Sequence, residues 1–463
     1  MESFESDGLF WLPNQEEDQV AGRVSFSPIT GTRLSLIGGF SETPFGDMEN
    51  GPEASIIHGV AGKRFLTLIG SSRASRRFES PGFMREDYRV EYMFAGQALL
   101  APESVVFNRV SVRFNNLYDW IGYSSVSREH VFDAQNKLVK AGLTLTPMEK
   151  IEHPADGCKI SIGGVWKILG NQQNPGFEQD FSISIAYEDP VGFESIVGDV
   201  TVLQDLLTAT TDAVSVPTHI TLEIPVGSGE GDSKPSFVQA YGQQPAYTRV
   251  KESKPSDMVL KLKEIGDIPS VARWFNFVRG RRVVLGLMLS SKYSQMYTEN
   301  KFFNAVSAAE TLHRMEFPNE LRPADEYKHF RRMLVRHVPK KYRSWLSQQL
   351  LHSNEPRLRD RLIELAEYAD LPSVLKCDAQ HWAKAVTDAR NRMVHHDKGK
   401  GPGASTVELY WLAESLRLMV LLCLARFCEF QEGYVEKIRN AQSVNFLVKR
   451  VGEIMQPSDA VES

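Results

Sequence analysis

Four polar residues that could take part in acid–base and phosphate chemistry lie close together in the C-terminal part of the chain. In the segment ARNRMVHHDKGKGPG, 389–403, Arg390 and Asn391 are followed by His395 and His396. An imidazole exchanges protons near neutral pH. A guanidinium neutralises phosphate oxygens and the charge that develops on them during reaction, and an amide can orient either group. The residue types therefore favour chemistry at a phosphate.

The surroundings of this segment favour a reaction without a metal. No carboxylate cluster and no set of histidines and cysteines with metal-ligand spacing accompanies it, so we expect neither a metal nor another cofactor. Arginine and histidine alone suit the cleavage of RNA by its own 2′-hydroxyl, which leaves a 2′,3′-cyclic phosphate and a 5′-hydroxyl. DNA lacks this nucleophile and is expected to resist.

The helix predicted over 378–396 sets the direction of each polar side chain. On an ideal helix, Asn391 and His395 share one polar side, Arg390 lies at its flank, and His396 turns back toward the apolar side. We interpret His395 as the catalytic imidazole and His396 as a supporting residue, with the choice between them open. Four apolar side chains form the predicted core stripe: Trp382, Val386, Ala389 and Met393.

The spacing between Arg390 and His395 predicts an assembly. Five positions place the two side chains roughly 140° apart on an ideal helix. They can converge if the last turn unwinds, if the arginine curls back, or if two copies of the helix meet across a two-fold axis. The spacing favours the last alternative, a homodimer or higher homo-oligomer with a shared cleft.

Arginine followed five positions later by histidine is a weak signal by itself. Arg332 and His337 have the same spacing, and short motifs match by chance. The pair at 390 and 395 differs because an amide follows the arginine, the histidine falls at a helix end, and a glycine-rich loop and a long apolar helix come next.

A basic segment, RRMLVRHVPKKYR at 331–343, holds six Lys or Arg and no acid. It is either a track for RNA phosphates, with strongly salt-dependent binding, or a solvated helix face whose aliphatic stems cover apolar neighbours. Little aromatic interleaving occurs, so no base stacking is expected. The candidate RNA-binding residues are Arg331, Arg332, Arg336, Lys340 and Lys341, together with Arg392.

The period of the apolar residues changes near residue 257. Before it, short segments rich in β-branched and aromatic residues predict an antiparallel sandwich or barrel, with a helix over 128–142. After it, amphipathic segments separated by prolines predict a helical bundle. Predicted strands cover 22–28, 32–40, 63–72, 88–96, 108–114, 159–169, 180–188 and 218–225. One predicted helix opens at Pro269. The other predicted helices cover 281–291, 299–315, 324–338, 355–369, 378–396 and 405–430.

Composition limits the class of protein. The 463 residues suffice for two or three domains. The formal charge of −5 divides into −8 over 1–296 and +3 over 297–463, which places any nucleic-acid contact in the C-terminal part. The four cysteines form no C-x-x-C pair, which favours reduced thiols. Neither a membrane span nor a secretion signal is found, so we expect a cytoplasmic protein without membrane contact.

RNRMVH at 390–395, with the apolar helix at 407–424, resembles the Arg-polar-x3-His signature of HEPN domains. The segment 297–317 resembles the first helix of the ApeA-like branch, and 8–26 and 107–122 resemble the ApeA N-terminal domain. The resemblance implies an α+β multidomain chain with an all-α HEPN bundle at its C-terminus. It also implies catalytic roles for Arg390, Asn391 and His395.

What the resemblance implies about function is a toxic ribonuclease of abortive infection, released by a phage-derived trigger that is expected to be a protein. The expected domains are a β-rich sensor over 1–260, a helical connector over 261–296 and a HEPN nuclease over 297–463. Two alternatives stay open: a degenerate HEPN bundle that only binds or dimerises, and a carbohydrate-binding β-sandwich with a helical partner domain. The intact motif weighs against the first alternative, and the absence of a secretion signal weighs against the second.

Overall fold

The computed structural model describes residues 1–40, 55–78, 82–96, 105–225, 235–251, 254–394 and 405–456. The chain divides into two compact units. The first, here called the sheet unit, comprises Met1–Arg279 and Lys292–Ser294. The second, here called the helical unit, comprises Gly280–Ser291 and Gln295–Ser463.

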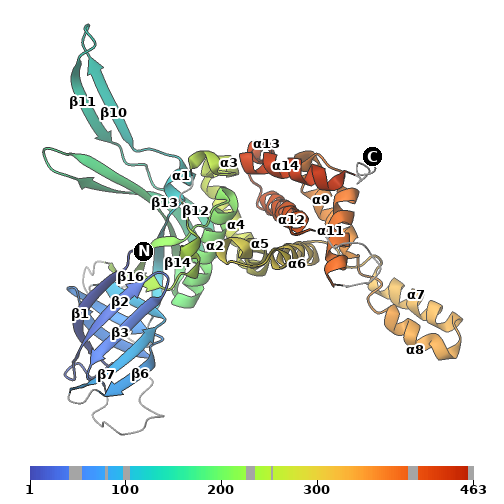
Figure 1. The fold of residues 1–463 in the computed structure, drawn as a ribbon, viewed down its shortest axis with the longest axis horizontal. Helices are drawn as coiled ribbons and strands as arrows, with labels where there is room; N and C mark the ends of the chain where they lie inside the picture. The colour runs from blue at the N-terminus through green and yellow to red at the C-terminus, as the bar shows by residue number, and fades with distance from the viewer. Residues whose placement is uncertain are drawn as a thin grey trace. The chain divides into compact units, whose positions relative to one another are not determined.

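The sheet unit is built on one antiparallel sheet of 14 strands, with a separate two-stranded hairpin (Figure 1). The strand order is β12-β13-β14-β9-β15-β16-β8-β5-β4-β1-β2-β3-β7-β6, so the first and second halves of the unit meet where β16 pairs with β8. The strands are β1 (Phe4–Trp11), β2 (Val20–Ser27), β3 (Gly31–Ile37), β4 (Ile56–Ala61), β5 (Arg64–Ile69), β6 (Ser72–Phe78), β7 (Met84–Val90), β8 (Tyr92–Gly96), β9 (Val106–Phe114), β10 (Val126–Phe132), β11 (Leu138–Leu145), β12 (Ile151–Ala155), β13 (Cys158–Leu169), β14 (Gly176–Gly192), β15 (Pro217–Ile224) and β16 (Ser236–Gly242).

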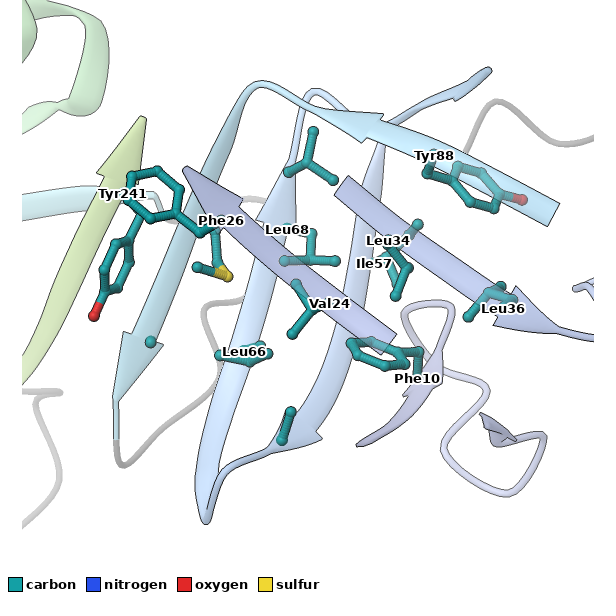
Figure 2. Close-up of a cluster of buried hydrophobic side chains, with 14 of the residues drawn as sticks. Phe10, Val24, Phe26, Leu34, Leu36, Ile57, Leu66, Leu68, Tyr88 and Tyr241 are labelled. Atoms are coloured by element: carbon teal, nitrogen blue, oxygen red, sulfur yellow. The ribbon is translucent and has the colours of Figure 1, made fainter. Parts of the chain in front are cut away.

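The core of the N-terminal half lies inside the curl of this sheet. Along β2, Val24 and Phe26 are buried and alternate with Arg23 and Ser25, which is the period of a strand with one face on a core. Figure 2 shows the buried side chains gathered between the curled strands. They come from β1, β2, β3, β4, β5, β7, β8 and β16 and include Phe10, Val24, Phe26, Leu34, Leu36, Ile57, Leu66, Leu68, Tyr88 and Tyr241.

The helix predicted over 128–142 is wrong, because this segment forms the hairpin of β10 and β11. Asp133 makes the turn: its carboxylate Oδ1 accepts hydrogen bonds from the backbone N–H of Gln135 and of Lys137, each at 2.9 Å. Asn136 takes the left-handed conformation with φ 62°. Asx hydrogen bonds of this kind compete with the helical ladder and reverse the chain locally.

In the described part of the sheet unit there are four α-helices, and the longest of them, α2, packs against β9 and β14. Trp274 of α4 is fully buried and donates its indole N–H to the carbonyl of Val202 in α2, at 3.2 Å. The helices are α1 (Leu117–Ile121), α2 (Phe193–Thr211), α3 (Leu262–Ile265) and α4 (Asp267–Arg279), with short 3-10 turns at Pro245–Arg249 and Pro255–Asp257.

The helical unit has α12 at its centre. Thirteen residues of α12 are buried, and the helix packs against α6, α9 and α14. The helices are α5 (Arg282–Tyr293), whose last two residues fall in the sheet unit, α6 (Thr298–Glu316), α7 (Ala324–His337), α8 (Lys340–Gln349), α9 (Leu358–Tyr368), α10 (Leu371–Leu375), α11 (Ala379–Val394), α12 (Thr406–Phe427), α13 (Tyr434–Asn440) and α14 (Gln442–Met455). A sheet domain followed by a helical bundle confirms the predicted α+β class.

Candidate functional site

The helix α11 carries two of the candidate catalytic residues, Arg390 and Asn391, and its apolar stripe faces the core as predicted. Trp382, Val386 and Ala389 of the core stripe are fully buried, and Met393 is half-buried. Asn391 is exposed and Arg390 is half-buried at the flank of the stripe. The guanidinium Nη1 of Arg390 lies 3.4 Å from the amide oxygen of Asn391. Both polar side chains therefore project from the bundle and can meet a substrate.

Buried contacts fix the position of α11. The indole N–H of Trp382 donates to Oγ of Ser415 in α12 at 3.0 Å, and that hydroxyl donates in turn to the carbonyl of Leu412. A buried indole needs such a partner, since an unpaired polar group in a core is costly. The hydrogen bond thus couples the helix that carries Arg390 to the central helix of the bundle.

Two helix N-termini lie at the end of the bundle where α11 ends. Arg392 lies 3.6 Å from Glu408 in the first turn of α12, whose start is capped by Ser405. Two positions after Glu408, the ring centroid of Tyr410 lies 5.7 Å from the ammonium group of Lys301, which is near the start of α6. Helix N-termini carry partial positive charge and favour anions. Arg392, two positions after Arg390, thus lies beside the start of α12, where Glu408 already supplies a negative charge.

The two candidate imidazoles, His395 and His396, lie outside the described residues, as does the glycine-rich loop after them. The pairing of Arg390 with His395, the shared cleft of two chains and the supporting role of His396 stay predictions. Among the residues that the structure describes, no group of three or more His, Cys, Asp or Glu side chains could hold a metal ion.

The second Arg-x4-His pair has a different setting. His337 uses its Nδ1 in a hydrogen bond with the carbonyl of Met333, one turn earlier in α7, at 2.8 Å. Arg332 is exposed, and α7 has no buried residue. Neither residue lies beside a buried stripe such as that of α11, so the structure distinguishes the two motifs although their spacing is equal.

The candidate RNA-binding residues divide into two groups. Arg331 donates to the backbone carbonyl and to Oγ of Ser347 in α8, at 2.7 and 2.9 Å, so it joins two helices. Arg392 faces Glu408, which balances part of its charge. The other four candidates are exposed on α7 and α8: Arg332, Arg336, Lys340 and Lys341.

A buried ionic network lies beneath the surface of the helical unit and is not predicted by the sequence patterns. His313 of α6 is fully buried and accepts a hydrogen bond at Nδ1 from Arg361 of α9, at 2.8 Å. This fixes the proton on Nε2, which lies 2.8 Å from the carboxylate of Glu364. Arg361 also donates to the carbonyl of Pro356 at 3.0 Å and to Asn319. A buried arginine is rare without such partners. The partners of Arg361 come from three separate segments of the chain.

The stability of the helical unit should fall as the solution becomes acidic. Burial lowers the pKa of His313 below its ordinary value of 6.5, and this outweighs the opposing effect of Glu364. The unfolded chain then binds the proton more readily, so the contribution is complete above pH 6.5 and is lost below it. Hydrogen exchange of α6 and α9 at pH 7.5 and 5.5 measures this loss. In His313→Gln the change should be smaller, and an equal change in both proteins would exclude His313 as its source.

A sheet unit followed by a bundle whose exposed helix end carries Arg390 and Asn391 describes a HEPN-domain protein with an additional N-terminal domain. Two family models match the chain: ApeA N-terminal domain 1 over residues 5–274 and Apea-like HEPN over residues 303–434. The first match alone covers more than half of the 463 residues. The chain therefore belongs to the ApeA-like HEPN family, which is associated with anti-phage defence and whose HEPN domains are typically ribonucleases.

No curated protein and no solved structure matches the chain. No described helix combines the length and the hydropathy that a bilayer span needs. Cys158, Cys423 and Cys428 are buried and Cys377 is half-buried, and no disulfide joins any of these four cysteines.

Proposed function

We propose that the protein is an anti-phage effector whose helical unit is a metal-independent endoribonuclease. The observation that supports this most is the position of Arg390 and Asn391. They lie in the last turns of α11, where Arg390 contacts Asn391, and His395 follows Asn391 by four positions in the sequence. A cation and an amide thus occur together at one helix end, with an imidazole four positions further along the sequence.

Each residue has a defined role in this proposal. His395 takes the proton from the 2′-hydroxyl as the oxygen attacks the adjacent phosphorus, and the bond to the 5′-oxygen breaks. The imidazolium so formed then gives this proton to the departing 5′-oxygen. Arg390 stabilises the charge on the phosphate oxygens, and Asn391 orients the imidazole or a substrate oxygen. The products are a 2′,3′-cyclic phosphate and a 5′-hydroxyl, and a second copy of the chain completes the cleft.

The sheet unit is proposed to detect infection and to control the nuclease. A toxic ribonuclease must be inactive before infection, and the acidic residues 1–296, with net charge −8, complement the net +3 of 297–463. A phage protein that binds the sheet unit would remove this restraint. Deletion of residues 1–260 tests the idea, because a fragment that still dimerises but stays inert would exclude simple masking.

RNA cleavage by the full chain isolated from phage-infected cells, in which the proposed restraint is removed, tests the proposed chemistry. We expect cleavage of RNA to continue in EDTA and to yield 2′,3′-cyclic phosphate ends. A substrate with a single 2′-deoxynucleotide at the cleaved position should resist, because it lacks the nucleophile. Abolition of cleavage by EDTA, or cutting at the deoxynucleotide, would contradict the mechanism.

A non-enzymatic scaffold with a degenerate HEPN bundle is the alternative function. Expression of the wild type beside Arg390→Ala and His395→Ala, with and without phage, distinguishes the two. Equal growth, equal RNA profiles and equal protection in all three strains would remove the enzyme and leave the scaffold.

A further inference from the structure

The helices α7 and α8, here called the arm (Ala324–Gln349), form a hairpin without a core of its own. No residue of either helix is buried, and in Figure 1 the two helices extend away from the rest of the helical unit. A helix pair that contributes nothing to the core of its domain is not explained by stability. The surface of this helix pair is therefore a candidate binding surface.

Polar contacts help to hold the arm together. At its base, Asn354 accepts a hydrogen bond from the N–H of Arg322 at 3.0 Å and donates to the carbonyl of the same residue at 2.8 Å. Between the helices, Arg331 binds Ser347, as described above. At the tip, Arg343 donates to the carbonyls of Val338 and of Arg336, at 3.1 and 2.9 Å. These contacts give the arm a defined shape on which other side chains are displayed.

The displayed side chains carry a strong positive charge. Residues 327–349 contain seven Lys or Arg and no Asp or Glu. Arg331 and Arg343 serve the internal contacts. The other five are exposed, and among the described residues none of their side chains forms a hydrogen bond or ion pair: Lys328, Arg332, Arg336, Lys340 and Lys341. Like charges at this density repel one another, so an anionic partner would stabilise the arm.

Two aromatic rings lie among these cations. On α8, Tyr342 is 49% exposed and Trp345 is 60% exposed. Lys341 lies one helical turn before Trp345, and its ammonium group is 4.8 Å from the ring centroid of Tyr342. The expectation that the basic segment offers no base stacking stays untested, but the exposed ring of Trp345 lies next to that segment. That expectation considered residues 331–343, whereas Trp345 lies two positions beyond them.

We propose that the arm binds RNA that has unpaired bases, with Trp345 stacking on one base, Tyr342 beside it, and the five exposed cations contacting phosphates. This inference rests on the proposed ribonuclease function and names the class of RNA that the nuclease takes. A duplex keeps its bases stacked on one another, so only a loop, bulge or single strand offers a free face to an indole. The combination of aromatic rings and unpaired cations matches a nucleic acid better than an apolar protein surface.

The test is binding of two labelled RNAs to the full chain: a hairpin with an unpaired loop, and a fully paired duplex with the same number of phosphates. Trp345→Ala should raise the dissociation constant for the loop RNA about tenfold and leave that for the duplex unchanged. Trp345→Phe should recover most of the affinity. Met333→Ala, which removes an exposed apolar side chain from α7 of the same arm, should leave both RNAs unaffected.

Salt dependence separates the role of the ring from that of the cations. The double variant Lys340→Ala and Lys341→Ala should weaken binding of both RNAs and reduce the slope of log K against log salt by roughly 1.5, since each phosphate contact contributes about 0.7–0.9. Trp345→Ala should leave that slope unchanged. A slope that changes with Trp345 and not with the lysines would overturn the assignment of roles.

Two other results would overturn the proposal. One is equal affinity of the wild type and Trp345→Ala for the loop RNA, including the absence of any binding. The other is a changed oligomeric state of Trp345→Ala in sedimentation with unchanged RNA affinity, which would make the arm a contact between copies of the chain. Because binding is measured without cleavage, Trp345-dependent binding by a chain that never cuts RNA would refute the nuclease and leave this inference intact.

Discussion

Arg390→Ala should lower the rate of RNA cleavage by about 10²–10³-fold, the loss typical when one group that stabilises the charge of a transition state is removed. The fold should persist, because the side chain is half-buried at the rim of the bundle and the hydrogen bond that it forms is with exposed Asn391. Single-turnover cleavage of a labelled RNA measures the loss. Circular dichroism checks that the helical content is unchanged.

The two imidazoles are separated by the same assay. His395→Ala should cost about 10²–10⁴-fold, as expected when a general base is removed, and His396→Ala should cost much less. The matched control is Lys384→Ala, because Lys384 lies on the same helix, is exposed and pairs at 3.3 Å with Asp388, away from the catalytic end. Cleavage at the wild-type rate by both Arg390→Ala and His395→Ala would refute the assignment, whereas a large loss in His396→Ala alone would exchange the roles of the imidazoles.

The alternation of apolar and polar residues predicted much of the fold because it reflects burial directly. Segments of period two became strands, as in β2 and β9, and segments of period 3.6 became helices, as in α6, α11 and α12. In α11 the same pattern also gave the correct orientation of Asn391 and Arg390, since three of the four stripe residues are fully buried. The orientation of a helix that is set by its own apolar stripe can be predicted without knowing the structure of the remaining chain.

The errors occur where turn chemistry or distant partners decide the structure. The period of the apolar residues predicts a helix where β10 and β11 form a hairpin. Asp133 and Asn136 reverse the chain there through a local hydrogen bond and a left-handed conformation, against that period. The network of His313 and Arg361 joins α6 to α9 across 48 positions of sequence, and nothing in the sequence near either residue indicates the other. The pairing of Arg390 with His395 is of the same kind, because it depends on how helix ends and chains come together.

The helix α11 both carries Arg390 and packs against the core of the bundle. A second large effect is therefore expected on stability. Trp382→Ala should lower the free energy of opening of the α11–α12 region by about 3–5 kcal/mol, the usual cost of replacing a buried aromatic ring by a methyl group. Trp382 is fully buried, and its indole N–H also binds Ser415. Its loss leaves both a cavity and a hydroxyl without its donor. Hydrogen exchange measured on peptides from α11 and α12 reports this opening without requiring that the whole chain unfold in one step.

Two further substitutions divide that cost into its parts. Trp382→Phe keeps most of the apolar volume and removes the hydrogen bond to Ser415, so it should cost about 1–2 kcal/mol. His381→Ala changes the neighbouring position, which is exposed and makes an exposed pair with Asp378, and should stay within about 0.5 kcal/mol of the wild type. Equal protection of α11 in Trp382→Ala and His381→Ala would show that the indole does not anchor the helix. If it does, Trp382→Ala should lose cleavage through disorder of α11, whereas Arg390→Ala loses it with α11 intact.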